Sequence, residues 1–543
     1  MPHPYPKEEV KANYTVFGLP FQQTGMFGNM VRLYQEQSDV LKPFIKHFPS
    51  VQNFKALAEN RQEQFKHRKE LVSVLEASYK GIETTAQKVN IEALSNDRTV
   101  TVTTGHQLCF LGGPMYFVYK AIHTIKLAEK LSADLARKVV PVFWLASEDH
   151  DFDEVAQITL FGKKKALKKE DNLVPVGRFN LQEFKQLKDF ALSFFQGFDS
   201  EKEINEMITS CWEGSENLSQ FTFKLLNRWF GDQGLLVLEP DNKVLKKLFR
   251  DTLRKEVKHS FSQDAVEHTL KRFPEHFKIQ APPKSCNLFY IKDGKRYRLD
   301  KITDDSFNLY KTDYSYSLRE MEDEIEDHPE RFSPNVILRP LYQETILPNI
   351  AYIGGGGELA YWVQLADLFE MANIPFPQVM LRNSFQLVDS GVAKKIEKLG
   401  LSPKDLFLEE NLLIDQLLAE GENTDVLDFR ELTEVKSSLF QLLKAKVEQV
   451  DPTLGNSVEA QEKGFEKALD SIQKKLKKRL KERQETEINQ VKNIKSRLFP
   501  DGGLQERSEN VLHYLAKHGN EFFDIIKEES GDIKSEFNLI YLP

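Results

Sequence analysis

Six ionisable side chains lie next to one another between Ser147 and Glu154, in the stretch SEDHDFDE. Like charges this close repel unless a cation, a substrate ammonium group or a helix N-terminus offsets them. Three explanations remain open: helix capping, a divalent metal ion, or recognition of an amine or of sugar hydroxyls with general-base catalysis. The candidate catalytic residues here are Asp149, His150 and Asp153, although the spacing matches no standard zinc pattern.

A second group of polar residues stands where a strand gives way to a helix, in TTGHQLCFLGGPMYFVYK. His106 is a further candidate catalytic residue. Paired glycines let a ligand approach the backbone, Pro114 suits a first helical turn, and free N–H groups there favour an anion. We expect a cradle for a carboxylate or phosphate, the alternative being a tight turn with a solvated lysine. Its substrate-binding candidates are Thr104, Gly105, Gln107, Gly112, Gly113, Tyr116 and Lys120.

The stretch GGGGELAYWVQL repeats this layout, with glycines ahead of a helix. It is neither a P-loop nor a GxGxxG motif. Glu358, Tyr361 and Gln364 recur at a spacing of three, which predicts a shared helical face. These three residues, with Gly355 and Gly356, are substrate-binding candidates; the alternative is a flexible connector with ordinary surface residues.

A fourth stretch, LFPDGGLQERSENVLHYL, offers hydrogen-bonding groups and a ring on which a base could stack. Gly502 and Gly503 are expected to end the preceding helix. The nucleotide-binding candidates are Gly502, Gln505, Arg507, Asn510 and Tyr514. The alternative is a structural joint.

The elements that must position these residues are strands and helices in alternation. RTVTVTTG predicts a strand, MYFVYKAIHTIKLAEKL a helix, and KVVPVFWLAS a strand buried on both faces. This order predicts a parallel sheet with helices on its faces. Ligands bind outside the carboxyl ends of such strands, so we expect the first three stretches to meet at one sheet edge.

The chain divides by pattern into successive parts. Residues 1–153 hold N-terminal helices and the first part of the core, 154–230 a first insert, and 231–260 more core. Residues 261–335, with a predicted hairpin at Asp293-Gly294, form a second insert, and 336–400 return to the core. A helical coiled-coil domain spans 401–500, and 501–543 return to the core.

Within the coiled-coil region, residues 457–498 predict one long polar helix with a narrow apolar stripe. The stripe has one wider gap after Leu480. Asp451-Pro452 and Gly455-Asn456 mark a turn before it, which predicts an antiparallel hairpin projecting from the body. The basic run KKLKKRLKERQ is interpreted as a solvated face.

Composition excludes several classes of protein. The 543 residues carry a net charge of −8 with a pI near 6.0, which argues against a general nucleic-acid binder. The three cysteines form no CxxC pair and fit a reducing cytosol. No 18-residue apolar run and no apolar leader are visible, so we expect a cytoplasmic protein that does not cross a membrane.

Four word strings together resemble one family: TTGHQ with GGP and YKAI, PVFWLASEDHDFDEV, GGGGELAYW, and LFPDGGLQER. They occur in the order found in the cysteine ligase family of bacillithiol biosynthesis, the BshC family, and the resemblance covers essentially the whole chain. It implies an α/β fold: a Rossmann-like parallel-sheet core with two inserted subdomains and a C-terminal α-helical coiled coil that forms a homodimer.

The resemblance also implies a carbon–nitrogen ligase that adds L-cysteine to glucosaminyl malate, with ATP as cosubstrate and a divalent cation such as Mg²⁺ as a further candidate. Neither HIGH nor KMSKS, the signature words of class I aminoacyl-tRNA synthetases, is present. Two other hypotheses remain: a metal-dependent hydrolase that uses EDHDFDE, and a non-catalytic scaffold for the pathway.

Overall fold

The computed structural model describes residues 7–11, 13–169, 173–419, 427–533 and 536–543. The chain forms two compact units. One, called the core unit below, comprises residues 20–386 and 503–538. The other, called the coil unit, comprises residues 1–19, 387–502 and 539–543. Small pieces of the predicted first insert and coiled-coil region, residues 170–172 and 420–426, lie outside the described residues.

A five-stranded parallel sheet organises the core unit, in the order β14-β13-β3-β4-β7. Its strands are β3 (Val100–His106), β4 (Val139–Leu145), β7 (Leu236–Leu238), β13 (Asn349–Gly354) and β14 (Gln378–Leu381). All seven residues of β4 are buried, as its unbroken apolar run predicts. The parallel sheet and Rossmann-like core are therefore confirmed, and the carboxyl ends of β3, β4 and β13 lie side by side.

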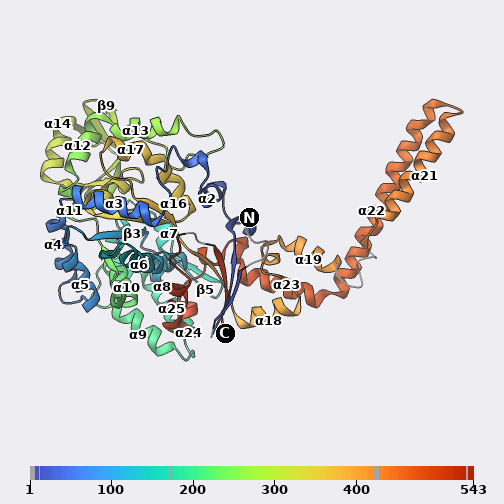
Figure 1. The fold of residues 1–543 in the computed structure, drawn as a ribbon, viewed down its shortest axis with the longest axis horizontal. Helices are drawn as coiled ribbons and strands as arrows, with labels where there is room; N and C mark the ends of the chain where they lie inside the picture. Colours follow the sequence, from blue (N-terminus) through green and yellow to red (C-terminus); the bar gives the residue numbers. More distant parts are fainter. Residues whose placement is uncertain (1–6, 12, 170–172, 420–426, 534–535) are drawn as a thin grey trace. The chain divides into compact units, whose positions relative to one another are not determined.

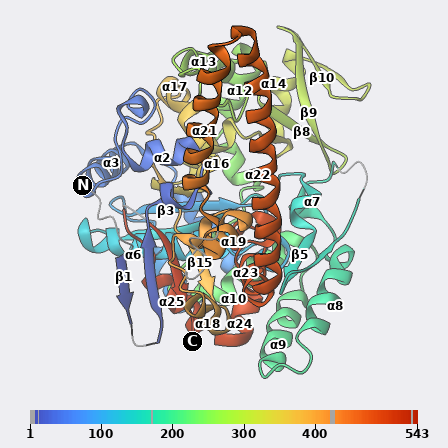
Figure 2. The ribbon, with the colours of Figure 1, turned by 90° about the vertical axis from the view of Figure 1, so that its right-hand side faces the viewer.

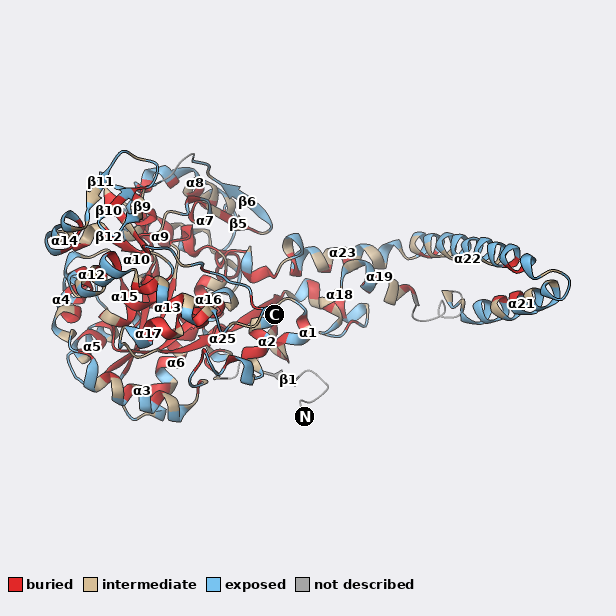
Figure 3. Ribbon diagram, turned by 90° about the horizontal axis from the view of Figure 1, so that it is seen from above, coloured by how far each residue is buried: buried red, intermediate tan, exposed pale blue. Residues whose placement is uncertain are grey.

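Two helices cover one face of this sheet. Helix α6 (Tyr116–Asp134) follows β3 as predicted, although Pro114 precedes the helix rather than occupying its first turn. Helix α3 (Val51–Gln64) joins it, and both pack against Val100 and Val102 in one apolar cluster. Most residues of these strands and the inward side chains of the two helices are buried, and Figure 3 shows buried residues gathered in the interior of the core unit. The remaining helices before β3 are α1 (Phe21–Thr24), α2 (Asn29–Gln35), α4 (Arg68–Tyr79) and α5 (Thr85–Ala93).

The segment between β4 and β7 contains the short strands that the sequence predicts, followed by helices. Strands β5 (Gln157–Leu160) and β6 (Lys163–Ala166) pair antiparallel. The helices of this segment are α7 (Phe152–Val155), α8 (Lys185–Phe194), α9 (Glu201–Trp212) and α10 (Leu218–Phe230).

The segment between β7 and β13 builds a second, antiparallel sheet in the order β11-β10-β9-β8-β12. The predicted hairpin at Asp293-Gly294 is confirmed, since both residues have positive φ. The strands are β8 (Leu288–Lys292), β9 (Lys295–Thr303), β10 (Ser306–Leu309), β11 (Ser315–Ser317) and β12 (Phe332–Pro334). The helices are α11 (Lys243–Lys247), α12 (Arg250–His259), α13 (Phe261–Leu270), α14 (Leu318–Asp327) and α15 (Leu338–Ile346).

After β13 the chain enters α16 (Gly356–Trp362) and α17 (Ala366–Met371) before β14. The last part of the core unit holds α24 (Leu512–His518) and α25 (Glu521–Glu528), so most of the C-terminal segment belongs to the same unit as the sheet. Figure 1 shows the order of these elements along the chain.

The coil unit contains a helical hairpin. Helices α21 (Arg430–Glu448) and α22 (Gly455–Arg483) run side by side (Figure 2), and Lys444 of α21 pairs with Glu459 of α22. The predicted single helix over 457–498 is wrong in one respect: it breaks at Gln484, and α23 (Glu485–Leu498) follows. The break falls in the gap of the apolar stripe. The helix also ends at Leu498 rather than at Gly502-Gly503.

The other elements of this part of the chain are a small sheet and two helices. The sheet has the order β1-β2-β16-β15, with strands β1 (Lys7–Val10), β2 (Thr15–Leu19), β15 (Ser384–Val388) and β16 (Phe537–Tyr541). The helices are α18 (Ser390–Lys398) and α19 (Glu410–Ala419).

The hairpin leaves apolar side chains on its surface. Leu439 and Leu442 of α21 are 54% and 67% exposed, and Ile472 of α22 is 51% exposed. Much of the hairpin is accordingly exposed in Figure 3. None of the helices in the described part of the chain is both long enough and apolar enough to cross a membrane.

Candidate active site

A cavity of about 810 Å³ opens at the carboxyl ends of β3, β4 and β13. The three stretches predicted to meet at one sheet edge all contribute to it. From the predicted residues, those that line it are Gly105, His106, Gln107, Tyr116, Lys120, Asp149, His150, Gly355, Gly356, Glu358, Tyr361 and Arg507. The edge rule for parallel sheets therefore located the cavity correctly.

A buried ion pair joins the two glycine-containing turns. Lys120 Nζ lies 2.5 Å from Glu358 Oε2 and donates to the carbonyl of Gly105 at 2.9 Å. Glu358 also accepts hydrogen bonds from the Tyr352 hydroxyl and the Gly355 amide. Although burial alone would raise it, the Lys120 ammonium holds the pKa of Glu358 below its usual value. The pair thus fixes the end of β3 against the start of α16.

A second buried pair stands beside it. Arg382, which follows β14, binds Glu506 with both terminal nitrogens, at 3.0 and 2.7 Å. Its guanidinium also lies over the ring of Tyr116, 5.1 Å from the centroid. Such bidentate pairing holds the planar groups in a fixed geometry. Glu506 thus anchors a cavity arginine from behind, and of residues 505–507 only Arg507 lines the cavity itself.

The side chains of the acidic stretch point in different directions, and each has its own surroundings. Glu148 pairs with the buried Lys246 at 2.6 Å, and Asp151 accepts from the Glu154 amide, capping α7. Asp149 accepts from the Gln107 amide at 2.5 Å and faces the cavity. Asp153 is exposed and does not line the cavity. Capping therefore explains part of the cluster, and a specific partner explains most of the rest.

His150 is held by an arginine from the second predicted insert. Arg296 Nη1 donates to His150 Nδ1 at 2.8 Å and lies 3.8 Å from Asp149 Oδ1. Burial and the neighbouring guanidinium lower the pKa of His150. Arg296 is itself anchored on Ser333 and the Pro334 carbonyl. Because His150 is neutral and its Nδ1 already accepts from Arg296, Asp149 is better placed than His150 to hold a substrate ammonium group.

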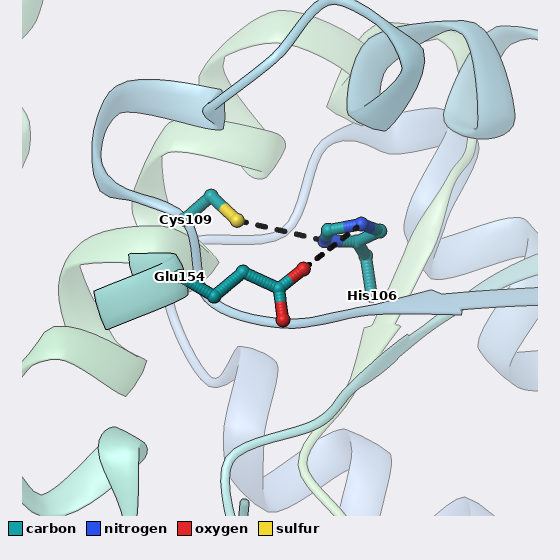
Figure 4. Close-up of side chains that lie close together, drawn as sticks. All are labelled: His106, Cys109 and Glu154. Atoms are coloured by element: carbon teal, nitrogen blue, oxygen red, sulfur yellow. Dashed lines mark hydrogen bonds and ion pairs between the residues drawn. The ribbon is translucent and has the colours of Figure 1, made fainter. Parts of the chain in front are cut away.

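Two groups with shifted pKa values face each other at the cavity wall (Figure 4). Burial, with the nearby Lys120 ammonium, lowers the pKa of His106 to about 3. Burial, with the neighbouring Asp151 and Asp149 carboxylates, raises the pKa of Glu154 to about 7. A carboxyl group with such a pKa can accept or donate a proton near neutral pH, so Glu154 is a general-base candidate.

The two glycine turns differ in what they offer. Gly355 and Gly356 line the cavity, and a Cβ at Gly356 would lie 2.7 Å from Val31. Gly112 and Gly113 do not line it: a Cβ at Gly113 would lie 2.3 Å from the Cβ of Cys109. Close packing therefore requires glycine at both Gly356 and Gly113, but only the first pair also lines the cavity.

Several predicted residues lie away from the cavity and have structural partners. The Thr104 hydroxyl donates to the Ile353 carbonyl. Helix α16 ends at Trp362, so Gln364 does not share a helical face with Glu358 and Tyr361 as predicted. Its side chain instead forms hydrogen bonds with the backbone of residues 280 and 281.

The same holds for most of the nucleotide-binding candidates. Asn510 donates to the Leu111 and Gly113 carbonyls, and Tyr514 is buried in a stack with Phe522. Gln505 is buried, and Gly502 lies in the turn after α23. The structural-joint interpretation fits these contacts, and Arg507 alone of the five lines the cavity.

Seven charged residues of the cavity lining were not among the predicted site residues: Glu148, Glu154, Lys284, Arg296, Arg298, Arg339 and Arg382. Glu154 stood inside the acidic stretch, and Arg382 directly follows a predicted strand, so both carried a usable signal. Arg296 and Arg339 carried no such signal in the sequence, because only long-range packing brings them to the carboxyl edge of the parallel sheet. Arg339 donates to Gln343 and to the Tyr361 hydroxyl, both uncharged.

In the part of the chain that the structure describes, one group of three side chains has the composition and spacing to hold a metal ion: His106, Cys109 and Glu154. Figure 4 shows the thiol and the carboxylate each joined to the imidazole by a dashed line. The carboxylates of the acidic stretch do not gather into such a group by themselves.

Comparisons with known proteins agree with this architecture. The family model described as the BshC N-terminal Rossmann-like domain of bacillithiol biosynthesis matches residues 16–383, and the BshC C-terminal coiled-coil domain matches residues 385–542. A Flavobacterium johnsoniae protein is 35% identical, covering 96% of this chain and 99% of its own length. A Christiangramia forsetii protein is 34% identical over 96% and 98%, and one from Bacillus cytotoxicus 28% over 89% and 91%. All three bear the name "Putative cysteine ligase BshC".

Proposed function

The chain belongs to the BshC family of bacillithiol biosynthesis, and we propose that it joins L-cysteine to glucosaminyl malate through an amide bond, with ATP as cosubstrate. The curated relatives are named as cysteine ligases, which supports a ligase. The identity of the bond, the second substrate and the use of ATP are the proposal.

The observation that carries the proposal is the charge pattern of the cavity. Lys120, Arg296 and Arg382 each face a carboxylate of the protein, whereas Arg339 donates only to uncharged partners among the contacts described above. A guanidinium whose hydrogen-bond partners in the protein are uncharged is suited to bind a ligand carboxylate, and it can do so through two parallel hydrogen bonds. We assign Arg339 to one carboxylate of the malate group.

The acidic side of the cavity suits the amine. Amide formation needs the amino nitrogen of the sugar to lose a proton as it attacks the activated carboxyl carbon of cysteine. Glu154, with a pKa near 7, is the base that takes this proton, and Asp149 holds the ammonium form before it. The leaving group departs as the C–N bond forms, and Gly356, which lines the cavity at the start of α16, is the backbone group assigned to the developing negative charge.

The other two hypotheses have less support. A hydrolase that uses EDHDFDE needs its carboxylates to converge on a metal, yet Glu148, Asp151 and Asp153 point to a lysine, a helix end and solvent. A scaffold would bind substrate without turnover, which remains an outcome of the test below.

Calorimetry with glucosaminyl malate tests the assignment of Arg339. Arg339→Met should weaken binding by a factor of about 10 to 100, the loss expected for one charge-assisted hydrogen-bond pair. Arg254→Met is the matched control, because Arg254 already pairs with Glu326 on the surface. Equal affinities for the wild type and Arg339→Met would refute the assignment, and binding with no amide product from any variant would favour the scaffold.

A further inference from the structure

Three side chains of different chemistry converge beneath the cavity wall: the imidazole of His106, the thiol of Cys109 and the carboxylate of Glu154. Cys109 Sγ lies 3.7 Å from His106 Nδ1, and Glu154 Oε1 lies 4.0 Å from His106 Nε2. One donor atom from each residue falls within a sphere in which no pair is more than 4.8 Å apart. The three come from the end of β3, the turn after it and α7 (Figure 4).

The surroundings fix the imidazole and leave one ring nitrogen available. Nδ1 lies 3.0 Å from the Gln107 carbonyl, to which it donates in the neutral tautomer. The ring packs edge-on against Tyr116 and Phe117, and its side chain is only 8% exposed. Nε2 then carries the lone pair. A backbone carbonyl on the second ring nitrogen is the usual way in which proteins orient a metal-binding histidine.

The thiol is held in place by the turn that follows. Leu111, Gly112 and Gly113 all have positive φ, and Gly113 packs directly against Cys109. Cys109 is 1% exposed and does not line the cavity, whereas His106 and Glu154 do. A ligand held by all three would therefore have the thiol behind it and the cavity in front of it.

We propose that His106 Nε2, Cys109 Sγ and a Glu154 carboxylate oxygen bind one zinc-class divalent ion, with the fourth coordination position open to the cavity. This zinc-bound state is separate from the state proposed above for amide formation, because a Glu154 carboxylate that holds the ion cannot also take the proton of the amine. Sulfur, nitrogen and one carboxylate oxygen are the donors that Zn²⁺ takes, whereas Mg²⁺ and Ca²⁺ require oxygen donors.

Small side-chain movements complete the geometry. Tetrahedral zinc separates its nitrogen, oxygen and sulfur donors by about 3.4 to 3.6 Å. The 4.0 Å between His106 Nε2 and Glu154 Oε1 must therefore close by roughly 0.5 Å, and a donor pair at the 4.8 Å limit by about 1.4 Å. Rotation of the Glu154 side chain, which is 37% exposed, supplies most of this. The nearby cations Lys120 and Arg382 are each paired with a carboxylate, Glu358 and Glu506, so little net positive charge opposes the ion.

Cobalt titration of the full-length chain, after treatment with a chelator, tests the site independently of any turnover. Co²⁺ bound to a thiolate gives a charge-transfer absorption that Co²⁺ in an oxygen-only site lacks. The wild type should show this band at one equivalent, and Zn²⁺ should abolish it by displacement. Cys109→Ser should lose the band, while Cys211→Ser, a change at another buried cysteine, should keep it.

A second variant keeps the test decisive if Cys109→Ser folds poorly. Glu154→Gln changes a partly exposed side chain and removes one ligand, so calorimetric Zn²⁺ affinity should fall at least on the order of 100-fold, beyond the 10- to 100-fold typical of outer-shell changes. The proposal is overturned if the wild type shows neither the band nor saturable Zn²⁺ binding, if Cys211→Ser loses the band equally, or if Glu154→Gln binds Zn²⁺ as tightly as the wild type.

Discussion

The ion pair between Lys120 and Glu358 is predicted to be a strongly coupled stabilising element of the core unit. The two side chains are 3% and 23% exposed, so removing one partner leaves the other charge poorly solvated. Loss of one partner of a buried pair costs about 3 to 5 kcal/mol, and the partial exposure of Glu358 places each single variant near 3 kcal/mol.

The perturbation is a double-mutant cycle with Lys120→Met and Glu358→Gln. Methionine keeps most of the apolar stem, and glutamine keeps one oxygen to accept from the Gly355 amide while its NH₂ group can donate to the Tyr352 hydroxyl. The double variant contains neither charge, so it should lose only about 1 to 2 kcal/mol instead of the roughly 6 kcal/mol that addition would give.

Tryptophan fluorescence during urea unfolding is the assay, because all four tryptophans lie in the core unit: Trp144, Trp212, Trp229 and Trp362. A cycle on the exposed pair Arg32–Glu36 is the control and should show coupling within about 0.5 kcal/mol. An additive result for Lys120 and Glu358 would refute the reasoning, since it would mean that the two charges do not depend on one another.

Three further outcomes are expected. The rate of amide formation by the wild type should rise with pH up to about 7, because Glu154 loses its proton over this range. The Glu154→Gln variant should be slower by about 10²–10⁴-fold, and its rate should lack this rise. A variant with the same pH profile as the wild type would exclude Glu154 as the base. Burial raises the pKa of Glu239 to about 7, so the folded state holds this proton to higher pH than the unfolded state, and stability falls as pH rises from about 4.5 to 7. Glu239→Gln should therefore match the wild type near pH 4.5 and exceed it by at most about 3 kcal/mol above pH 7 in the same fluorescence assay, whereas a constant difference would contradict the assignment. We predict that the full-length chain sediments as a dimer and that changing Leu442 and Ile472, both more than half exposed, to glutamate gives monomers. A monomeric wild type, or a dimer that survives both changes, would contradict this prediction.

The sequence was most informative where local pattern decides structure. The alternation in β3 and the apolar run of β4 predicted the parallel sheet, and the edge rule then predicted which stretches would meet. It failed where a single residue breaks a pattern, as at Gln484, where the helix divides without a proline or glycine. Polar candidates such as Asn510 also failed to reach the cavity, because hydrogen-bonding side chains serve a buried joint as well as a ligand.

Two of the cavity arginines, Arg296 and Arg339, could not be predicted for a different reason. Arg296 sits in a hairpin and Arg339 on a helix that precedes β13, and neither has a distinctive neighbour in sequence. Their place at the sheet edge depends on how the second sheet packs against the first strands, which is a property of long-range contacts. Glu154 shows the intermediate case: its position was visible, but its pKa depends on burial that only the fold supplies.

The most direct test of the central claim uses the purified chain alone, with glucosaminyl malate, isotopically labelled L-cysteine and ATP. Mass spectrometry should detect labelled bacillithiol, its formation should require ATP, and nucleotide consumption should match product one to one. Binding of glucosaminyl malate with no labelled product over several hours, at a protein concentration comparable with that of the substrates, would contradict the claim that this chain forms the amide bond.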